Sequence, residues 1–439
     1  MTTKSITFRV SPGGTLKGTA RVPGDKSISH RSIMLGSIAE GTTRVTGFLE
    51  AEDCLSTMSA FRAMGVEIEG PENGQVVVHG VGLHGLKASS EPLYLGNSGT
   101  SMRLMSGLLA GQKFDSTLTG DPSLTKRPMK RVTDPLKAMG AVIETSPTGT
   151  APLNIKGQGQ LKGMHYDMPI ASAQVKSCML LAGLYAEGET SVTEPAPTRD
   201  HTERMLSGFG YKVKRTGNKI SVRSGGKLKA MDIDVPSDIS SAAFFLVGGS
   251  IAEGADVTLQ HVGMNPTRTG IIDILKLMGA NIEVLNPREV GGEPVADLRV
   301  QSAQLHGIQI PEDLVPLAID EFPVLFVAAA FAEGPTTLTG AEELRVKESD
   351  RIQVMADGLV ALGIKAQPTP DGMVIQPGFM KGGRVHSHGD HRIAMAFSIA
   401  GLRANGPIVI EDCANVNTSF PTFVSIAQSL GLNVRVSED

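Results

Sequence analysis

Residues 172–195, SAQVKSCMLLAGLYAEGETSVTEP, hold the pattern that decides the fold. Ser172 opens a largely apolar helix that we expect to run to Ala186, and Gly188 follows it. The next residues, TSVTEP, are typical of a strand. A helix that is apolar on nearly every side should be buried, whereas a polar first turn suits a binding site.

The same pattern recurs along the chain. A Met, Leu or Phe followed by glycine precedes a short strand at six places, with the glycines at Gly65, Gly140, Gly210, Gly279, Gly363 and Gly431. Another glycine ends an apolar helix before each pair, at Gly41, Gly111, Gly188, Gly254, Gly334 and Gly406. Glycine often follows a helix, but six matches in register predict six βαβαββ repeats in an α/β protein.

Length and composition narrow the classes of function. A chain of 439 residues favours two domains, and its net charge of −4 gives no basic surface for nucleic acid or an anionic membrane. The three cysteines lie far apart, the N-terminal residues lack the apolar core of a signal peptide, and no apolar run is long enough to cross a bilayer. We therefore expect a cytoplasmic protein.

Two polar motifs stand where helices should begin. The segment 23–31, PGDKSISHR, places Lys26, Ser27 and Arg31 after a glycine, and an ammonium, a hydroxyl and a guanidinium together suit a phosphate. The segment 96–103, GNSGTSMR, puts glycines beside Asn and Ser, which lets a ligand approach the backbone closely. Each motif taken alone is also compatible with an ordinary capped helix.

Cations recur before the second helix of several repeats, at Arg127, Arg199, Arg268 and Arg351. Pro128 predicts that a helix begins beside Arg127. Two carboxylates are acid/base candidates: Asp320 in AIDEFP and Glu348 in RVKESDR. Asp320 is equally compatible with a helix cap, and Glu348 with an ion pair to its neighbouring cations.

The segment 386–391, HSHGDH, matches a zinc signature of metallo-β-lactamase-like hydrolases. Such a site needs further histidine ligands downstream, and His391 is the last histidine of the chain. This disfavours a zinc site, and we expect no metal.

Eight motifs between about residues 13 and 435 closely resemble the 5-enolpyruvylshikimate-3-phosphate synthase family: PGDKSISHR, GNSGTSMR, LTKRP, ASAQVKS, NPTRTG, IDE, RVKESDR and DHRIAM. The resemblance implies an enolpyruvyl transferase-like fold, an inside-out α/β barrel with two similar domains of three βαβαββ repeats each. One domain would hold residues 1–22 and 236–439, and the other residues 23–235, with the active site in the cleft between them.

The resemblance also implies an activity. The chain would transfer the enolpyruvyl group of phosphoenolpyruvate to the 5-hydroxyl of shikimate 3-phosphate and release phosphate, as a monomer without a cofactor. Asp320 would take the hydroxyl proton, and Lys26 or Glu348 would protonate the methylene carbon. The residues implied for shikimate 3-phosphate are Lys26, Ser27, Arg31, Ser172, Ala173, Gln174, Arg199, Asp320 and Lys347. Those implied for phosphoenolpyruvate are Lys26, Gly99, Arg127, Gln174, Arg351 and Arg392.

Some positions depart from the family pattern. Many members carry Ser and Tyr where this chain has Thr198 and Arg199, and many carry a Lys near Thr418. One cation expected near phosphoenolpyruvate is therefore missing or supplied elsewhere. In the family, Gly99 lies beside the phosphoenolpyruvate site, which the inhibitor glyphosate also occupies, so the glycine predicts a glyphosate target.

Two alternative functions fit these residues less well. The sister transferase acting on UDP-N-acetylglucosamine generally uses a mobile-loop cysteine and an Asn after the first lysine, whereas residues 111–127 lack cysteine and Ser27 follows Lys26. A binding protein without turnover would not need Lys26, Asp320, Glu348 and Arg392 together.

Overall fold

The computed structural model describes residues 5–158 and 160–438, and the chain divides into two compact units. Unit 1 holds the described residues up to Pro23 together with those from Pro236 onward, and unit 2 runs from Gly24 to Val235. Each unit has an apolar core of its own. Among the described residues, no helix has both the length and the apolar character needed to span a bilayer.

Unit 2 contains three successive repeats. Its helices are α1 (Lys26–Ile38), α2 (Glu52–Ala63), α3 (Gly99–Ala110), α4 (Lys130–Ala138), α5 (Ala173–Gly183) and α6 (His201–Gly208). Its strands are β3 (Glu40–Thr46), β4 (Glu67–Glu72), β5 (Gln75–Val81), β6 (Leu93–Tyr94), β7 (Ser116–Thr119), β8 (Val142–Glu144), β9 (Leu153–Lys156), β10 (His165–Asp167), β11 (Glu189–Thr193), β12 (Val213–Thr216), β13 (Lys219–Arg223) and β14 (Ile233–Asp234). They form sheets in the orders β14-β3-β5-β4, β6-β7-β9-β8 and β10-β11-β13-β12.

Unit 1 repeats this plan. Its helices are α7 (Ile239–Ile251), α8 (Gly270–Leu277), α9 (Phe322–Ala330), α10 (Arg351–Ala361), α11 (His391–Ala400) and α12 (Phe423–Leu430). Its strands are β1 (Ile6–Val10), β2 (Lys17–Ala20), β15 (Asp256–Gly263), β16 (Asn281–Val290), β17 (Glu293–Gln301), β18 (Thr336–Leu338), β19 (Lys365–Thr369), β20 (Gly372–Gln376), β21 (Gly383–His386), β22 (Ile408–Glu411) and β23 (Val434–Glu438). The sheet orders are β16-β17-β15-β2, β18-β20-β19 and β21-β22-β1-β23.

One pairing rule governs the six sheets. In the four-stranded sheets one outer strand pairs parallel with its neighbour, and the other pairs are antiparallel. In the three-stranded sheet the outer position is reduced to a single parallel bridge between Gln309 and Thr337. The predicted α/β class with six repeats is confirmed.

Three strands come from distant parts of the chain. Strand β2 pairs with β15 in unit 1, and β14 pairs with β3 in unit 2. Strand β1 pairs with both β22 and β23 and occupies an inner position of the last sheet. The first, fourth and last repeats of the sequence are therefore completed by segments that lie far away in the chain.

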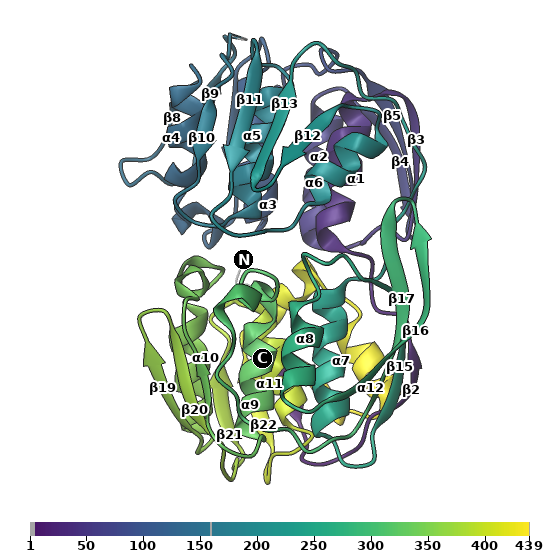
Figure 1. The fold of residues 1–439 in the computed structure, drawn as a ribbon, viewed down its shortest axis with the longest axis vertical. Helices are drawn as coiled ribbons and strands as arrows, with labels where there is room; N and C mark the ends of the chain where they lie inside the picture. The colour runs from purple at the N-terminus through teal and green to yellow at the C-terminus, as the bar shows by residue number, and fades with distance from the viewer. Residues whose placement is uncertain (1–4, 159, 439) are drawn as a thin grey trace. The chain divides into compact units, whose positions relative to one another are not determined.

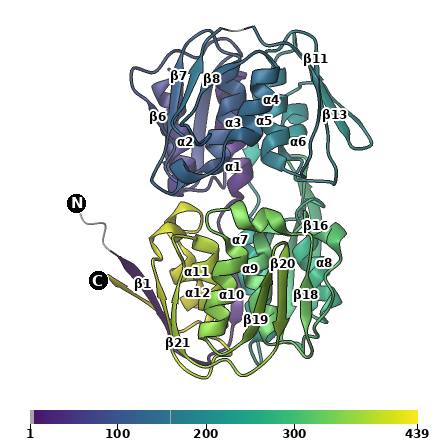
Figure 2. The same cartoon turned by 90° about the vertical axis from the view of Figure 1, so that its left-hand side faces the viewer.

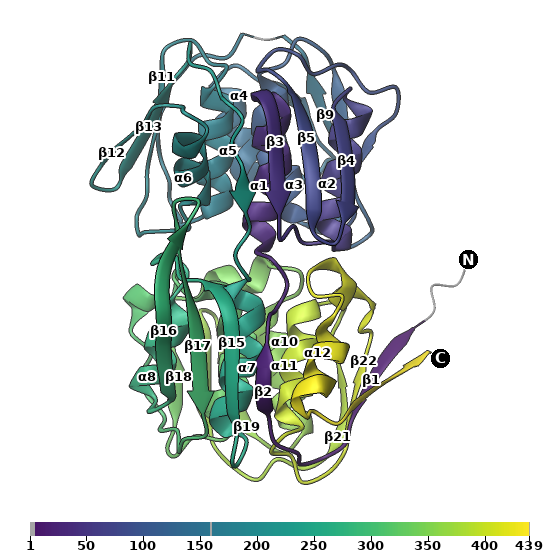
Figure 3. The same ribbon diagram turned by 90° about the vertical axis from the view of Figure 1, so that its right-hand side faces the viewer.

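In Figure 1, α7 and α9 lie between β19 and β20 on one side and β15 to β17 on the other, and Figure 2 shows the same unit from its side. Figure 3 shows β3 and β5 in front of α1, and β15 in front of α7. All thirteen residues of α7 are buried. Helices α3 and α5 approach so closely that a Cβ on Gly107 would lie 2.1 Å from the carbonyl oxygen of Cys178, so only glycine fits there.

Two helix boundaries differ from the sequence predictions. Helix α5 ends at Gly183, before the predicted Ala186. Pro128 does not lie in the first turn of a helix, because α4 begins at Lys130. Arg127 instead follows a short 3-10 turn, Leu124–Lys126, and has an extended backbone.

Candidate active site

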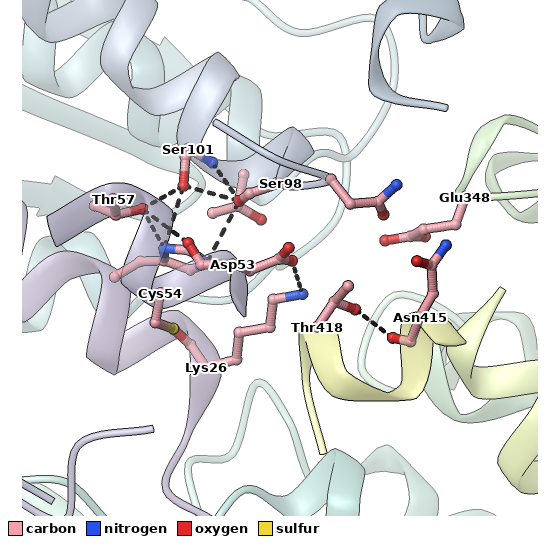
Figure 4. Close-up of polar contacts among 12 residues, drawn as sticks. Lys26, Asp53, Cys54, Thr57, Ser98, Ser101, Glu348, Asn415 and Thr418 are labelled. Atoms are coloured by element: carbon pink, nitrogen blue, oxygen red, sulfur yellow. Dashed lines mark hydrogen bonds and ion pairs between the residues drawn. The ribbon is translucent and has the colours of Figure 1, made fainter. Parts of the chain in front are cut away.

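Helix α1 begins at Lys26 because the Asp25 side chain caps it, accepting a hydrogen bond of 2.8 Å from the backbone N–H of Ile28. The Lys26 ammonium forms an ion pair with the carboxylate of Asp53 (Figure 4). Asp53 lies in the first turn of α2 and is buried. The carboxylate therefore holds the ammonium at the start of α1.

Arg31 lies one turn further along α1 and is buried. Its Nε donates to the hydroxyl of Thr202 at 2.7 Å, and one Nη donates to the hydroxyl of Ser177 at 3.1 Å. The other Nη donates to the carbonyl oxygen of Ser27 at 3.0 Å. Arg31 therefore connects α1 with α5 and α6.

His30 connects α1 with α2 and α3. Its Nδ1 lies 2.9 Å from the hydroxyl of Thr57 and 3.2 Å from that of Ser101, and its Nε2 lies 3.5 Å from the hydroxyl of Ser98, which caps α3. Burial, helped by the charges of Lys26 and Arg31, holds the pKa of His30 well below its ordinary value. A neutral imidazole therefore lies among hydroxyl groups at this junction (Figure 4 labels the three hydroxyl residues).

The first turns of α3 and α5 are joined through Gln174. Its side-chain oxygen accepts a bond of 2.7 Å from Arg103, and its side-chain nitrogen donates to the hydroxyl of Thr100 at 3.0 Å. Ser172 caps α5, and Ala173 is its first residue. Next to Gly99, Arg127 is buried and donates to the side-chain oxygen of Asn97 at 2.7 Å.

The first two turns of α1, α3 and α5 are thus joined in a closed ring, which we call the unit 2 ring. Within unit 2 the structure brings together these predicted residues: Lys26, Ser27, Arg31, Gly99, Ser172, Ala173 and Gln174, with Arg127 beside Gly99. Three helix N-termini with adjacent cations favour an anionic ligand. Arg199 lies just before α6, on the loop that leads to Thr202.

In unit 1 a single arginine gathers the predicted acidic residues. Arg351 is fully buried; its Nε donates to Asp390 at 2.9 Å, one Nη to Asp320 at 3.1 Å and the other to Glu348 at 2.8 Å. Burial alone would lower the pKa of Arg351, but the three carboxylates raise it above its ordinary value. Arg351 thus holds both acid/base candidates near each other.

The remaining predicted residues of unit 1 lie around this cluster. The Lys347 ammonium lies 3.7 Å from Asp320, and Asp390 caps α11, accepting from the backbone N–H of Arg392 at 3.0 Å. Asp320 does not cap a helix through its side chain; it lies in the short 3-10 turn Ile319–Glu321 before α9. The structure therefore favours a role for Asp320 other than the helix cap.

Comparisons with known proteins identify the family. The profile described as EPSP synthase (3-phosphoshikimate 1-carboxyvinyltransferase) matches residues 10–426. A relative from Methylococcus capsulatus with the name 3-phosphoshikimate 1-carboxyvinyltransferase is 70% identical over 434 residues, covering 99% of each chain. The chain belongs to the EPSP synthase family.

Solved structures agree with this assignment. An EPSP synthase from Acinetobacter baumannii is 63% identical to this member of the family, has a TM-score of 0.88 and covers 99% of this chain and 100% of its own. The enolpyruvyl transferase NikO from Streptomyces tendae has a TM-score of 0.76 at 16% identity, with full coverage of both chains, and shares the fold alone.

In this EPSP synthase family member, the HSHGDH segment contains a residue that pairs with Arg351. Asp390 accepts hydrogen bonds from Arg351 and from Ser349. His386 and His388 are exposed, whereas Asp390 and His391 are buried. Among the described residues, these four do not bring three ligand atoms together.

The segment that lacks the expected lysine is held within unit 1. The hydroxyl of Thr418 donates to the carbonyl oxygen of Asn415 at 2.6 Å, and the Asn415 side chain donates to the carbonyl oxygen of Gly389 at 2.6 Å (Figure 4). These bonds tie the 3-10 turn Ala414–Thr418 to the loop before α11.

Sequence reasoning missed several residues that position the site. Asp53, Asn97 and Asp390 each hold a predicted cation, and His30 links three helices. The polar N-termini of the helices were a usable signal for Asn97, His30 and Asp390. No comparable signal marked Asp53, because its partner lies on a different helix of the repeat.

Proposed function

We propose that this chain transfers the enolpyruvyl group of phosphoenolpyruvate to the 5-hydroxyl of shikimate 3-phosphate and releases inorganic phosphate. Membership of the EPSP synthase family supports this activity, as do relatives named 3-phosphoshikimate 1-carboxyvinyltransferase at 70% identity. The chain is an enzyme of the shikimate pathway, in which aromatic amino acids are made.

The observation that carries the proposal is the unit 2 ring. Its helix N-termini point backbone N–H groups and positive dipole ends toward the place where Lys26 and Arg31 lie. A phosphorylated substrate fits this arrangement better than a neutral one. Lys26, Ser27, Arg31, Ser172, Ala173, Gln174 and Arg199 would hold shikimate 3-phosphate, with Asp320 and Lys347 on its hydroxyl groups.

Phosphoenolpyruvate would be held by Lys26, Gly99, Arg127, Gln174, Arg351 and Arg392. We propose that both sets of residues act on one pair of substrates. Because Arg351 donates to three carboxylates, phosphoenolpyruvate would have to share or replace one of these contacts.

The reaction would proceed by addition and elimination. Asp320 would accept the proton of the 5-hydroxyl group while the oxygen of that hydroxyl group attacks C2 of phosphoenolpyruvate. Lys26 or Glu348 would protonate the methylene carbon. The same carbon then loses a proton as the C2–O bond to phosphate breaks, which restores the enol ether. Arg351 donates a hydrogen bond of 3.1 Å to Asp320 and so holds the proposed base in place.

The test is phosphate release by the purified chain with both substrates, accompanied by detection of the enolpyruvyl product. We expect release to require shikimate 3-phosphate and to stop when either substrate is omitted. Release with UDP-N-acetylglucosamine in place of shikimate 3-phosphate would instead support the sister activity. The absence of turnover, with binding intact, would indicate a binding protein.

We also propose that the enzyme acts in the cytoplasm as a monomer. The three cysteines are buried thiols, which is in keeping with a reducing compartment. Light scattering of the purified chain tests the oligomeric state.

A further inference from the structure

A fully buried lysine lies in the first turn of α5, two residues beyond Gln174, one of the residues proposed to hold shikimate 3-phosphate. The Lys176 ammonium lies 2.7 Å from the carboxylate of Glu194 and 3.0 Å from that of Glu203. It also donates to the carbonyl oxygen of Thr198 at 3.5 Å. Lys176 and Glu194 have no exposed side-chain surface. We call Lys176, Glu194 and Glu203 the buried triad.

The buried triad is not explained by stability. Removing an ammonium and two carboxylates from water costs several kcal/mol per ion, and apolar residues of similar volume often stabilise a core as well or better. Arg215, which is partly exposed, lies 3.4 Å from Glu194 and 3.6 Å from Glu203, so two cations face two carboxylates. Burial nevertheless raises the pKa of Glu203, against the opposing effect of Lys176.

The triad instead fixes a loop. Glu194 stands at the start of residues 194–200, and Thr198 near the end is held twice: its carbonyl oxygen accepts from Lys176, and its hydroxyl bonds to Glu194. Pro195 and Pro197 restrict the backbone conformation of the loop between Glu194 and Thr198. Arg199 is the next residue, and Glu203 follows in the first turn of α6.

Lys176 also belongs to the same turn of α5 as the residues proposed to hold the phosphate. Its backbone N–H donates to the carbonyl oxygen of Ser172 at 3.1 Å, so the lysine is part of the first turn of α5. One side chain thus connects that turn to the loop that carries Arg199. A movement of Arg199 relative to Ser172 would therefore disturb the contacts of the buried triad.

We propose that the buried triad is a set of positioning residues: it holds Arg199 at a fixed distance from the first turn of α5, so that both reach the phosphate of shikimate 3-phosphate. The inference rests on the proposed function, because it takes Arg199 and Ser172 as ligands of that phosphate. On this inference, the apolar helix α5 contains a lysine because that lysine increases the affinity for shikimate 3-phosphate.

Two variants test the role of the triad. Thr198→Val removes only the hydroxyl bond to Glu194 and keeps the shape of the residue. The triple variant Lys176→Met, Glu194→Gln, Glu203→Gln removes all three charges together, so no unpaired ion stays buried. We expect KM for shikimate 3-phosphate to rise about 10-fold in the triple variant, and less in Thr198→Val, while KM for phosphoenolpyruvate changes less than about 2-fold.

The control is Ile155→Ala, which opens a cavity in β9 of the same unit, away from the loop. We expect it to lower the unfolding temperature without changing either KM. If the triple variant behaves in the same way, with a lower unfolding temperature and an unchanged KM for shikimate 3-phosphate, the triad is structural and the inference is wrong.

A double-mutant cycle with Arg199→Ala gives the sharper answer. If the triad acts through Arg199, Thr198→Val should raise KM for shikimate 3-phosphate in the native background and have little further effect once Arg199 is alanine. Independent, multiplying effects would contradict the inference. An inactive native chain would instead contradict the proposed function, since every variant is compared with native phosphate release.

Discussion

At the scale of single residues, Asp320 is the proposed base, and its contacts make the substitution easy to interpret. Asp320→Asn keeps an oxygen that can accept from Arg351 but cannot take a proton from the substrate hydroxyl. We expect turnover to fall roughly 10²-fold or more, whereas shikimate 3-phosphate still binds. Steady-state phosphate release and equilibrium binding measure the two effects separately.

The exposed Asp313→Asn provides a matched control, since it removes a carboxylate from the preceding 3-10 turn of unit 1. It should leave turnover unchanged. Near-native turnover in Asp320→Asn would remove this residue from the proton transfer.

Gly99 offers a second test at this scale. A Cβ on Gly99 would lie 3.0 Å from an Nη atom of Arg127 and 2.9 Å from one of Arg103, both at the ends of flexible side chains. Gly99→Ala should therefore fold and displace Arg127 by a few tenths of an ångström. Glyphosate is longer than phosphoenolpyruvate, so we expect the methyl group to weaken the inhibitor by roughly 10-fold and the substrate by less.

Inhibition curves for native, Gly99→Ala and the α3 control Ser106→Ala decide this point. The native enzyme should be inhibited in competition with phosphoenolpyruvate, and so should Ser106→Ala. If the native enzyme is already resistant to glyphosate and Gly99→Ala does not change this resistance, the methyl group does not act by a steric clash with the inhibitor.

At the scale of elements, His30 joins three helices in its neutral form, which makes the stability of unit 2 depend on pH. The folded state holds the pKa of His30 well below its ordinary value, whereas the unfolded chain takes up a proton near pH 6.5. The unfolded state therefore binds more protons below that pH, and stability is lost as the pH falls. The loss is about 1.4 kcal/mol per pH unit until the folded pKa is reached.

Denaturant unfolding at pH 7 and pH 5.5 checks this expectation. The native chain should lose roughly 1 kcal/mol more than His30→Gln, which keeps a polar side chain without the titration. The charges of Lys26 and Arg31 oppose the protonation of His30, whereas the charge of Asp25 favours it. All variants compared in this experiment therefore keep these three residues. His84→Gln, at an exposed position, should behave like the native chain. Parallel pH dependence in all three proteins would contradict the expectation.

The same elements explain how far sequence reasoning reached. The glycine register predicted the six repeats because each repeat is built from contacts that are close in the chain. Strand β2 pairs in unit 1, β14 pairs in unit 2, and β1 lies at an inner position of the last sheet. No local sequence pattern marks these pairings, because they depend on which strand edges remain unpaired. The start of the helix near Pro128 was predicted too early, because the residues just before it form a short 3-10 turn that is not part of the helix. Asp53 was missed because ion pairs between helices follow from packing.

At the scale of the whole molecule, each unit has a separate core, and this predicts independent folding. A chain restricted to residues 24–235 keeps all three sheets of unit 2, including the pairing of β14 with β3. We expect this fragment to unfold cooperatively and to bind shikimate 3-phosphate more weakly than the full chain, because Asp320 and Lys347 are absent. It should show no turnover.

Calorimetry and titration with shikimate 3-phosphate test the fragment. Arg31→Ala in the fragment is the control for binding through the proposed site. A fragment that folds but does not bind would contradict the assignment of the phosphate contacts to unit 2.

The inner position of β1 has a consequence for how the protein is made. This strand leaves the ribosome long before its partners β22 and β23. Unit 2, which lies between them in the sequence, can be completed earlier, whereas the last sheet of unit 1 must wait until β22 and β23 have been translated. Until then, β1 exposes unpaired backbone groups that favour association with other nascent strands. We therefore expect β1 to need protection from association until β22 and β23 have been made.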